Sequence, residues 1–204
     1  MFGGLITALG IAEVADGGGL SVCCPGGFLD DVANGASIAV DGVCLTATKI
    51  KGDSFRADLS AETIRRCAPW QSGQKVHLEK PLRMGDEIGG HFVSGHIDGI
   101  AIVISQKTEN TGAATFHIAA PKTAAPMIAE KGSVALAGVS LTIGEVFDNK
   151  GGEVLDGKDG KCIFAVHIIP HTLQATTLGK WQTGQKVNIE ADILARYCAR
   201  LCQK

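Results

Sequence analysis

Residues 35–50 read GASIAVDGVCLTATKI, and residues 131–146 read KGSVALAGVSLTIGEV. The second stretch repeats the first, and Ser140 takes the place of Cys44. Short β-branched runs separated by glycine turns are typical of antiparallel strands. This pair of stretches therefore predicts a β-rich fold that occurs twice in the chain.

Two further blocks repeat in the same order. LSAETIRR at 59–66 falls opposite IIPHTLQA at 168–175, and APWQSGQKVHLEK at 68–80 falls opposite GKWQTGQKVNIEA at 179–191. Repeats of roughly 90–110 residues are too long for a solenoid unit and large enough for a small domain. The sequence therefore predicts a tandem duplication.

The spacing between the repeats places an insertion and a boundary. The offset between matching blocks grows mostly across DNKGGEVLDGKDGK at 148–161, which we interpret as an exposed hairpin loop in the second repeat. The boundary falls near 82–90, where RMGDEIGG is polar and glycine-rich, as a linker is.

Local signals within each repeat predict strands and one short helix. Asp41-Gly42 is a strong hairpin turn between the runs at 37–40 and 43–48. Ser60 is placed to cap a helix, and Pro170 opens the counterpart in the second repeat. The last segment, ADILARYCARLCQK at 191–204, has one apolar helical face. That face predicts packing on its own domain or on the same helix of other subunits; it consists of Ile193, Leu194, Tyr197 and Leu201.

Composition excludes several classes of protein. The 204 residues are 45% hydrophobic and 20% charged, which excludes a disordered chain, and a net charge of −2 disfavours a nucleic-acid binder. No apolar run is long enough for a membrane span, and no basic residue precedes Lys49, so we expect no signal peptide. Seven cysteines without a C-x-x-C pair indicate reduced thiols in a cytoplasmic protein rather than a metal site or a disulfide framework.

The longest motifs identify a family. The start MFGGLI, DGVCLTAT, IGGHFVSGHIDG, GVSLTIGEV and IIPHTLQATTL, followed by GQKVNIEADILARY, resemble the riboflavin synthases of the α-chain type. The resemblance covers essentially the whole chain. It implies an all-β fold of two tandem six-stranded antiparallel Greek-key barrels, at 1–88 and 89–190. It also implies a C-terminal helix at 191–204 that holds a homotrimer together.

The resemblance also implies a reaction. Two molecules of 6,7-dimethyl-8-ribityllumazine exchange a four-carbon unit to give riboflavin and 5-amino-6-ribitylaminouracil, the final step of riboflavin biosynthesis. No cofactor or metal is expected, because the substrate carries both an electrophilic ring and an acidic methyl group. In the family the productive site lies between the N-terminal barrel of one subunit and the C-terminal barrel of a neighbour. Lumazine synthase is a further expected partner.

Four residues match positions of the family at which we expect catalysis. His96 is the expected proton-transfer residue, because an imidazole titrates near neutral pH. Cys44 and Ser140 occupy equivalent positions in the two pockets, where they hydrogen-bond the ring or hold the adding nucleophile. Asp192 matches a family acid near the active site, although an acid at the start of the last helix has an equally good structural explanation.

The family motifs also imply substrate-binding residues. Gly4, Leu5 and Ile6 match the N-terminal segment that covers the pteridine ring. The remaining expected contacts of the first repeat and its linker are Ser37, Cys44, Leu45, Thr46, Asp58, Leu59, Ser60, Ala61, Glu62, Thr63, Gly95, His96 and Ile97. Those of the second repeat are Lys131, Ser140, Leu141, Thr142, His167, Ile168, Ile169, Pro170, His171 and Thr172.

Two departures from the family pattern keep another class in view. Gly3 stands where the family usually has Thr, and Ala137 stands where it commonly has an acid. Lumazine proteins resemble the synthases but only carry a bound lumazine or flavin. The retained second-repeat residues, together with His96, favour an enzyme. A flavin-dependent oxidoreductase of a related barrel type would need a nucleotide-binding domain, and no G-x-G-x-x-G or P-loop is present.

Overall fold

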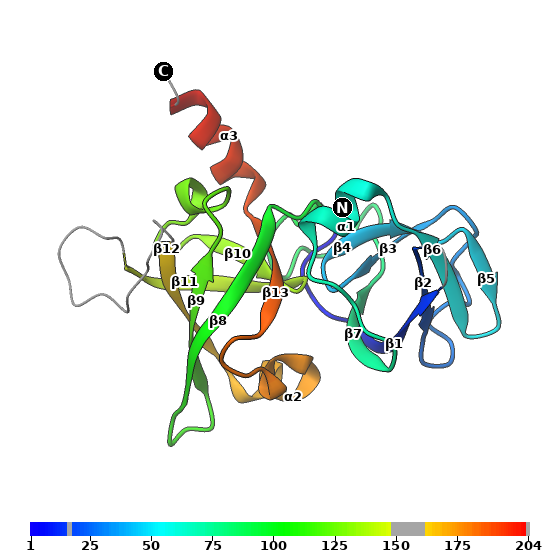
Figure 1. The fold of residues 1–204 in the computed structure, drawn as a ribbon, viewed down its shortest axis with the longest axis horizontal. Helices are drawn as coiled ribbons and strands as arrows, with labels where there is room; N and C mark the ends of the chain where they lie inside the picture. The colour runs from blue at the N-terminus through cyan, green and yellow to red at the C-terminus, as the bar shows by residue number, and fades with distance from the viewer. Residues whose placement is uncertain (16–17, 148–161, 203–204) are drawn as a thin grey trace.

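The computed structural model describes residues 1–15, 18–147 and 162–202 and forms two β-barrels side by side with a helix at the C-terminus (Figure 1). The predicted hairpin loop at 148–161 lies outside the described residues. Among the residues described, no helix is both long enough and apolar enough to cross a membrane.

The second barrel is closed by hydrogen bonds. Its six antiparallel strands follow the order β10-β11-β12-β9-β8-β13, and β13 pairs with β10 to complete the ring. Crossovers from β9 to β10 and from β12 to β13 give the predicted Greek-key connection. The strands are β8 (Gly99–Thr108), β9 (Ala114–Ala120), β10 (Ser133–Leu136), β11 (Val139–Phe147), β12 (Cys162–Ile168) and β13 (Lys186–Ala191).

The first barrel repeats this order in a seven-stranded curled sheet, β4-β3-β7-β1-β2-β6-β5. Its end strands β4 and β5 are consecutive in the chain and together match β11, so six strand positions recur. The counterpart β11 stays continuous and absorbs the same bend as a bulge between Ile143 and Val146. The strands are β1 (Ala8–Ala15), β2 (Gly19–Cys23), β3 (Ser37–Val40), β4 (Val43–Thr46), β5 (Lys49–Lys51), β6 (Ser54–Asp58) and β7 (Gln74–Glu79).

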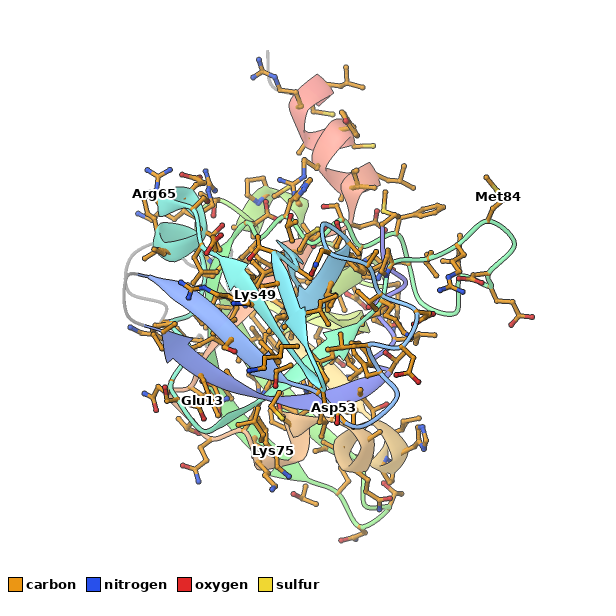
Figure 2. The ribbon with its side chains drawn as sticks, turned by 90° about the vertical axis from the view of Figure 1, so that its right-hand side faces the viewer. Glu13, Lys49, Asp53, Arg65, Lys75 and Met84 are labelled. Atoms are coloured by element: carbon orange, nitrogen blue, oxygen red, sulfur yellow. The ribbon has the colours of Figure 1, made fainter. Side chains whose placement is uncertain are left out.

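Alternating apolar residues fill each barrel. Phe55, Leu20 and Leu78 are buried in the first core, and Phe116 and Phe164 in the second. Charged side chains such as Glu13, Lys49 and Lys75 cover the outer surface of the first barrel (Figure 2). Burial of the apolar face of each strand is what sets strand register.

Short helices follow matching strands of the two barrels. Helix α1 (Ala61–Arg66) begins after Ser60, whose hydroxyl accepts the Thr63 N–H, which confirms the predicted cap. Helix α2 (Pro170–Ala175) begins at the predicted proline, so Thr172 lies inside the helix and does not cap it. Two 3-10 turns, η1 (Ala125–Met127) and η2 (Thr177–Lys180), complete the second half.

Helix α3 (Ile193–Cys202) projects from the second barrel (Figure 1). None of its described residues is buried, and three large side chains of the predicted apolar face lie in solvent: Leu194, Tyr197 and Leu201 are 66%, 64% and 83% exposed. Packing against its own barrel therefore leaves most of this face uncovered.

A polar network joins the barrels where the β3–β4 and β10–β11 turns abut. An added Cβ on Gly42 would lie 2.6 Å from the Gly138 nitrogen, so the two backbones are in contact. The fully buried His77 bridges them: the Thr177 N–H donates to Nε2 at 2.8 Å, and Nδ1 lies 2.8 Å from the Ala137 carbonyl oxygen. Because a carbonyl accepts and a backbone N–H donates, Nδ1 is the donor and Nε2 the acceptor in these two contacts.

Candidate active site

Two segments of the chain cross from one barrel to the other. We define the first arm as residues 1–6 and the second arm as residues 92–97. Just beyond the first arm, the Thr7 N–H still donates to Leu78 of its own barrel. Closer to the N-terminus, the Gly4 carbonyl accepts the Ser140 N–H of the second barrel at 2.8 Å.

The second arm makes the reciprocal contact. The Gly95 carbonyl accepts the Cys44 N–H of the first barrel at 3.0 Å. The two arms also pair with each other, because Phe2 and Val93 exchange both backbone hydrogen bonds, at 2.7 and 3.0 Å. Phe2 is fully buried between the barrels. Cys44 of the first barrel therefore contacts the arm of the second barrel, and the equivalent Ser140 contacts the arm of the first.

Glycine is required at both crossing points. Gly4 and Gly95 have φ angles of 72° and 82°, a region that side-chain-bearing residues seldom adopt. An added Cβ would lie 2.6 Å from Ser140 Cβ at Gly4 and 2.5 Å from Cys44 Cβ at Gly95. The absence of a side chain is thus what lets each arm approach the opposite barrel.

A cavity of about 390 Å³ marks the first pocket. It brings together six of the residues predicted from the sequence: Cys44, Glu62, Thr63, Gly95, His96 and Ile97. The sequence analysis missed five further lining residues, Val43, Arg66, Cys67, Asp98 and Arg196. Arg196 belongs to α3, so the C-terminal helix reaches this pocket.

Three ion pairs, formed by two carboxylates, lie at the first pocket. Arg66 and Arg65 bind the Glu62 carboxylate and lower its pKa. Arg196 donates two guanidinium hydrogen bonds to the buried Asp98 carboxylate, at 2.6 and 3.0 Å, and this carboxylate also accepts the Ala191 N–H. A bidentate pair of this kind fixes geometry as well as charge. It therefore holds α3 against the residue that follows the second arm.

The other expected residues of the first repeat do not line this cavity. Leu45 is buried inside the barrel, and Ser37 pairs with Thr46 across the β3–β4 hairpin. Asp58, Leu59, Ser60 and Ala61 form the end of β6 and the start of α1, and none of these four lines the cavity.

Ser140 takes the place of Cys44 in the second barrel, at the crossing of the first arm. Its hydroxyl lies 2.7 Å from Nδ1 of His91, a residue the sequence analysis did not assign to the site. His91 is buried, which lowers its pKa, while the Asp192 carboxylate acts in the opposite direction. Within the described residues, His91 Nε2 has no hydrogen-bond partner. The structure thus brings Ser140, Asp192 and the first arm together around an unpredicted histidine.

The remaining expected residues of the second repeat spread over the barrel end. Leu141 and Ile6 pack on the second core, Ile168 is inside it, and Thr142 is exposed. His167 points outward between Thr115 and Glu145, at 2.9 and 3.2 Å. Ile169, Pro170 and His171 are exposed, Thr172 is half-buried, and Lys131 has a left-handed backbone with φ 65°.

Buried carboxylates hold both arms to their own barrels. Glu79 at the end of β7 accepts the N–H groups of Gly3 and Gly4, and Glu190 in β13 accepts those of Ser94 and Gly95. Burial raises the pKa of Glu79 to about 7 and also raises the pKa of Glu190, while the N–H donors oppose both shifts. The sequence showed that these residues align between repeats, but not what they bind.

A second cavity, of about 930 Å³, lies between the barrels on the side of the GQK turns. It is lined by residues such as Lys75, Lys180 and Lys186 and contains no residue predicted for the site. Six of the predicted residues therefore line the cavity at the second arm, and none lines this larger groove.

Two pseudo-equivalent barrels, each contacted by an arm of the other, define a duplicated-barrel protein. The Lumazine binding domain family matches residues 4–81 and 94–192, one match per barrel. Riboflavin synthase of Brucella abortus is 46% identical over 176 residues, covering 83% of this chain and 80% of the relative. Riboflavin synthase of Photobacterium phosphoreum is 41% identical over 207 residues, covering 98% and 88%.

A solved structure described as LumP complexed with riboflavin superposes with a TM-score of 0.77 at 25% identity, covering 94% of this chain and 99% of the other. The family match spans nearly all of both barrels, and the curated relatives exceed 40% identity over most of the chain. The chain therefore belongs to the riboflavin synthase family of lumazine-binding proteins.

Proposed function

We propose that this protein is a transferase that makes riboflavin from two molecules of 6,7-dimethyl-8-ribityllumazine. One molecule gives up a four-carbon unit and leaves as 5-amino-6-ribitylaminouracil; the other accepts the unit and becomes riboflavin. The observation that carries the proposal is the reciprocal crossing of the arms at Cys44 and Ser140. A reaction between two copies of one molecule needs two similar binding sites, and two repeat-related arm crossings support such a pair.

The chemistry lies mainly in the substrate. The pteridine ring is the electrophile, and a ring methyl group supplies the carbanion, so the protein has to orient two rings and move protons. His96, exposed at the rim of the first pocket, is our candidate for removing and returning the methyl proton. No external cofactor or metal enters this scheme.

In the second pocket, the Ser140 hydroxyl is the candidate for hydrogen bonding to the ring or to the adding nucleophile. Its contact with His91 fixes the hydroxyl direction, and Asp192 lies near enough to influence that imidazole. Cys44 is the counterpart in the first pocket. The other family-matched residues of both repeats are proposed to contact the pyrimidine edge and the ribityl chain.

We also propose the assembly that completes the site. With barrels at 1–88 and 89–190 and a trimerisation segment at 191–204 that contains α3, the exposed apolar face of this helix fits a homotrimer interface. A trimer places the first barrel of one subunit against the second barrel of its neighbour, ring against ring. Cytoplasmic location and contact with lumazine synthase belong to the same proposal.

A direct assay tests the activity. The purified protein is mixed with 6,7-dimethyl-8-ribityllumazine alone, and absorbance follows the loss of lumazine and the appearance of riboflavin. We expect riboflavin to form with no added cofactor. Lumazine that is bound, with altered fluorescence, but never consumed would contradict the proposal and identify a carrier instead.

A further inference from the structure

Each arm is held by a buried carboxylate at the end of its own barrel. Glu79, 5% exposed, accepts the Gly3 N–H at 2.7 Å with Oε1 and the Gly4 N–H at 3.1 Å with Oε2. Glu190, 2% exposed, accepts the Ser94 N–H at 2.7 Å and the Gly95 N–H at 2.9 Å in the same two-oxygen manner. Two carboxylates at repeat-related positions thus make the same pair of contacts.

In each arm, the glycine whose N–H binds the carboxylate is also the residue whose carbonyl binds the other barrel. The Gly4 N–H binds Glu79 while the Gly4 carbonyl binds the Ser140 N–H at 2.8 Å. In the second arm, the Gly95 N–H binds Glu190 while the Gly95 carbonyl binds the Cys44 N–H at 3.0 Å. One glycine residue therefore links each carboxylate to the pocket residue of the opposite barrel.

These carboxylates are not explained by ion pairing. In the described part of the chain, neither Glu79 nor Glu190 lies in a side-chain salt bridge. A buried carboxylate is costly, and here backbone N–H groups compensate it. Without the carboxylate, those N–H groups would be buried unpaired, and a chain terminus that is not tied down frays.

We propose that Glu79 and Glu190 are positioning residues, each acting on the pocket of the barrel to which it does not belong. Glu79 of the first barrel holds the first arm against Ser140. Glu190 of the second barrel holds the second arm against Cys44 and presents His96 at the first pocket. The effect on catalysis rests on the proposed function. The positioning of each arm by the carboxylate of its own barrel does not.

Amide hydrogen exchange on the full chain tests this crossing. Glu79→Gln keeps the side-chain size but replaces one carboxylate oxygen with an NH2 group. One of the two arm N–H groups then faces a donor and loses its acceptor. At pH 8 we expect the amides of Gly3, Gly4 and Ser140 to exchange about tenfold faster than in wild type, because the variant loses one charge-assisted hydrogen bond. The amides of Ser94, Gly95 and Cys44 should keep wild-type rates.

Glu190→Gln is the matched partner and should give the reverse pattern, with faster exchange at Ser94, Gly95 and Cys44 only. Faster exchange confined to the arm, without Ser140 in Glu79→Gln or Cys44 in Glu190→Gln, would overturn the proposal. Uniform acceleration at both crossings would overturn it as well. Circular dichroism and thermal melting establish that each variant is folded.

A milder variant keeps the test decisive if a glutamine variant does not fold. Ser94→Ala removes the Ser94 hydroxyl contacts to Glu190, at 2.6 Å, and to the His96 N–H, at 3.2 Å, and leaves both backbone contacts to Glu190. We expect a smaller acceleration at Ser94, Gly95 and Cys44 and none at Gly3, Gly4 and Ser140. Acceleration at the first arm, or none at Cys44, would contradict the crossed assignment.

Turnover gives an independent readout. Glu79→Gln should lower riboflavin formation non-additively with Ser140→Ala and additively with Cys44→Ala, because only the first pair shares a pocket. Additivity with both would overturn the positioning role. If the wild-type protein does not convert lumazine, the proposed function fails, while the exchange pattern still decides the arm proposal.

Discussion

Glu79 links the pH dependence of folding to the first arm. Its folded pKa of about 7 lies above its ordinary value of 4.5, so the folded state binds the proton more tightly than the unfolded state does. The stability contributed by the protonated group is complete below about pH 4.5 and is lost as pH rises through 7. At most about 3 kcal/mol is involved.

We therefore expect the free energy of unfolding of Glu79→Gln to depend less on pH between 4.5 and 7 than that of wild type. Urea titrations at several pH values measure it. Asp31→Asn is the control, because Lys80 and Arg83 lower the pKa of this exposed acid and it does not titrate in that range. Identical slopes in wild type and Glu79→Gln would show that Glu79 titrates normally.

Gly3 and Gly4 should differ sharply in tolerance. A Cβ on Gly3 would meet Glu79 Oε1 at 3.6 Å, an ordinary contact, whereas one on Gly4 would meet Ser140 Cβ at 2.6 Å on a left-handed backbone. Gly4→Ala should cost about 2 kcal/mol or more of stability and most of the riboflavin formation, and Gly3→Ala little of either. Denaturant melts and the lumazine assay compare the two. Equal effects would mean that the first arm does not cross as described.

Among single residues, the sequence predicted those site residues that belong to the repeat or to a long motif. Cys44, His96 and Gly95 do meet in one cavity. The partners of Glu79, the His91–Ser140 contact and the Arg196–Asp98 pair could not be predicted, because each joins segments more than 40 residues apart. Ala137 keeps the left-handed turn of Asp41, with φ 46° at both positions, so the departure from Asp removes a carboxylate acceptor like the one that binds Trp70 and His77 in the first repeat and leaves the turn itself unchanged.

Helix α3 has an apolar face that the described part of the chain leaves exposed to solvent. In the proposed homotrimer, replacing Tyr197 and Leu201 with Ser should release single 21.1 kDa chains, because it removes two of the exposed apolar side chains of α3. Light scattering after size-exclusion chromatography measures the mass. Cys198→Ser, on the same helix, should leave the mass unchanged. A double variant that keeps the wild-type mass would exclude this face as the interface.

The elements themselves were largely predictable because their signals are local. The Asp41-Gly42 turn, the Ser60 cap and the start of α2 at Pro170 each depend on a few neighbouring residues. The interruption between β4 and β5 was not predicted, because its counterpart β11 carries a similar pattern and bends by a bulge instead. Barrel curvature, a tertiary property, decides between these outcomes.

Over the whole molecule, duplication has produced two barrels that are not independent. The arms exchange, the Gly42 and Gly138 turns abut, and His77 bridges to Thr177. The number of barrels and their order could be predicted from the repeat, but the exchange of arms could not, because nothing in the repeat shows which barrel an arm will contact.

The most direct test of the account is a complete product balance with 6,7-dimethyl-8-ribityllumazine as the only small molecule supplied. Chromatography at the end of the reaction quantifies all three compounds. A protein that holds two copies of one substrate and moves four carbons between them must form one riboflavin and one 5-amino-6-ribitylaminouracil for every two lumazines consumed. Riboflavin without an equal amount of the aminouracil, or no consumption at all, would contradict it.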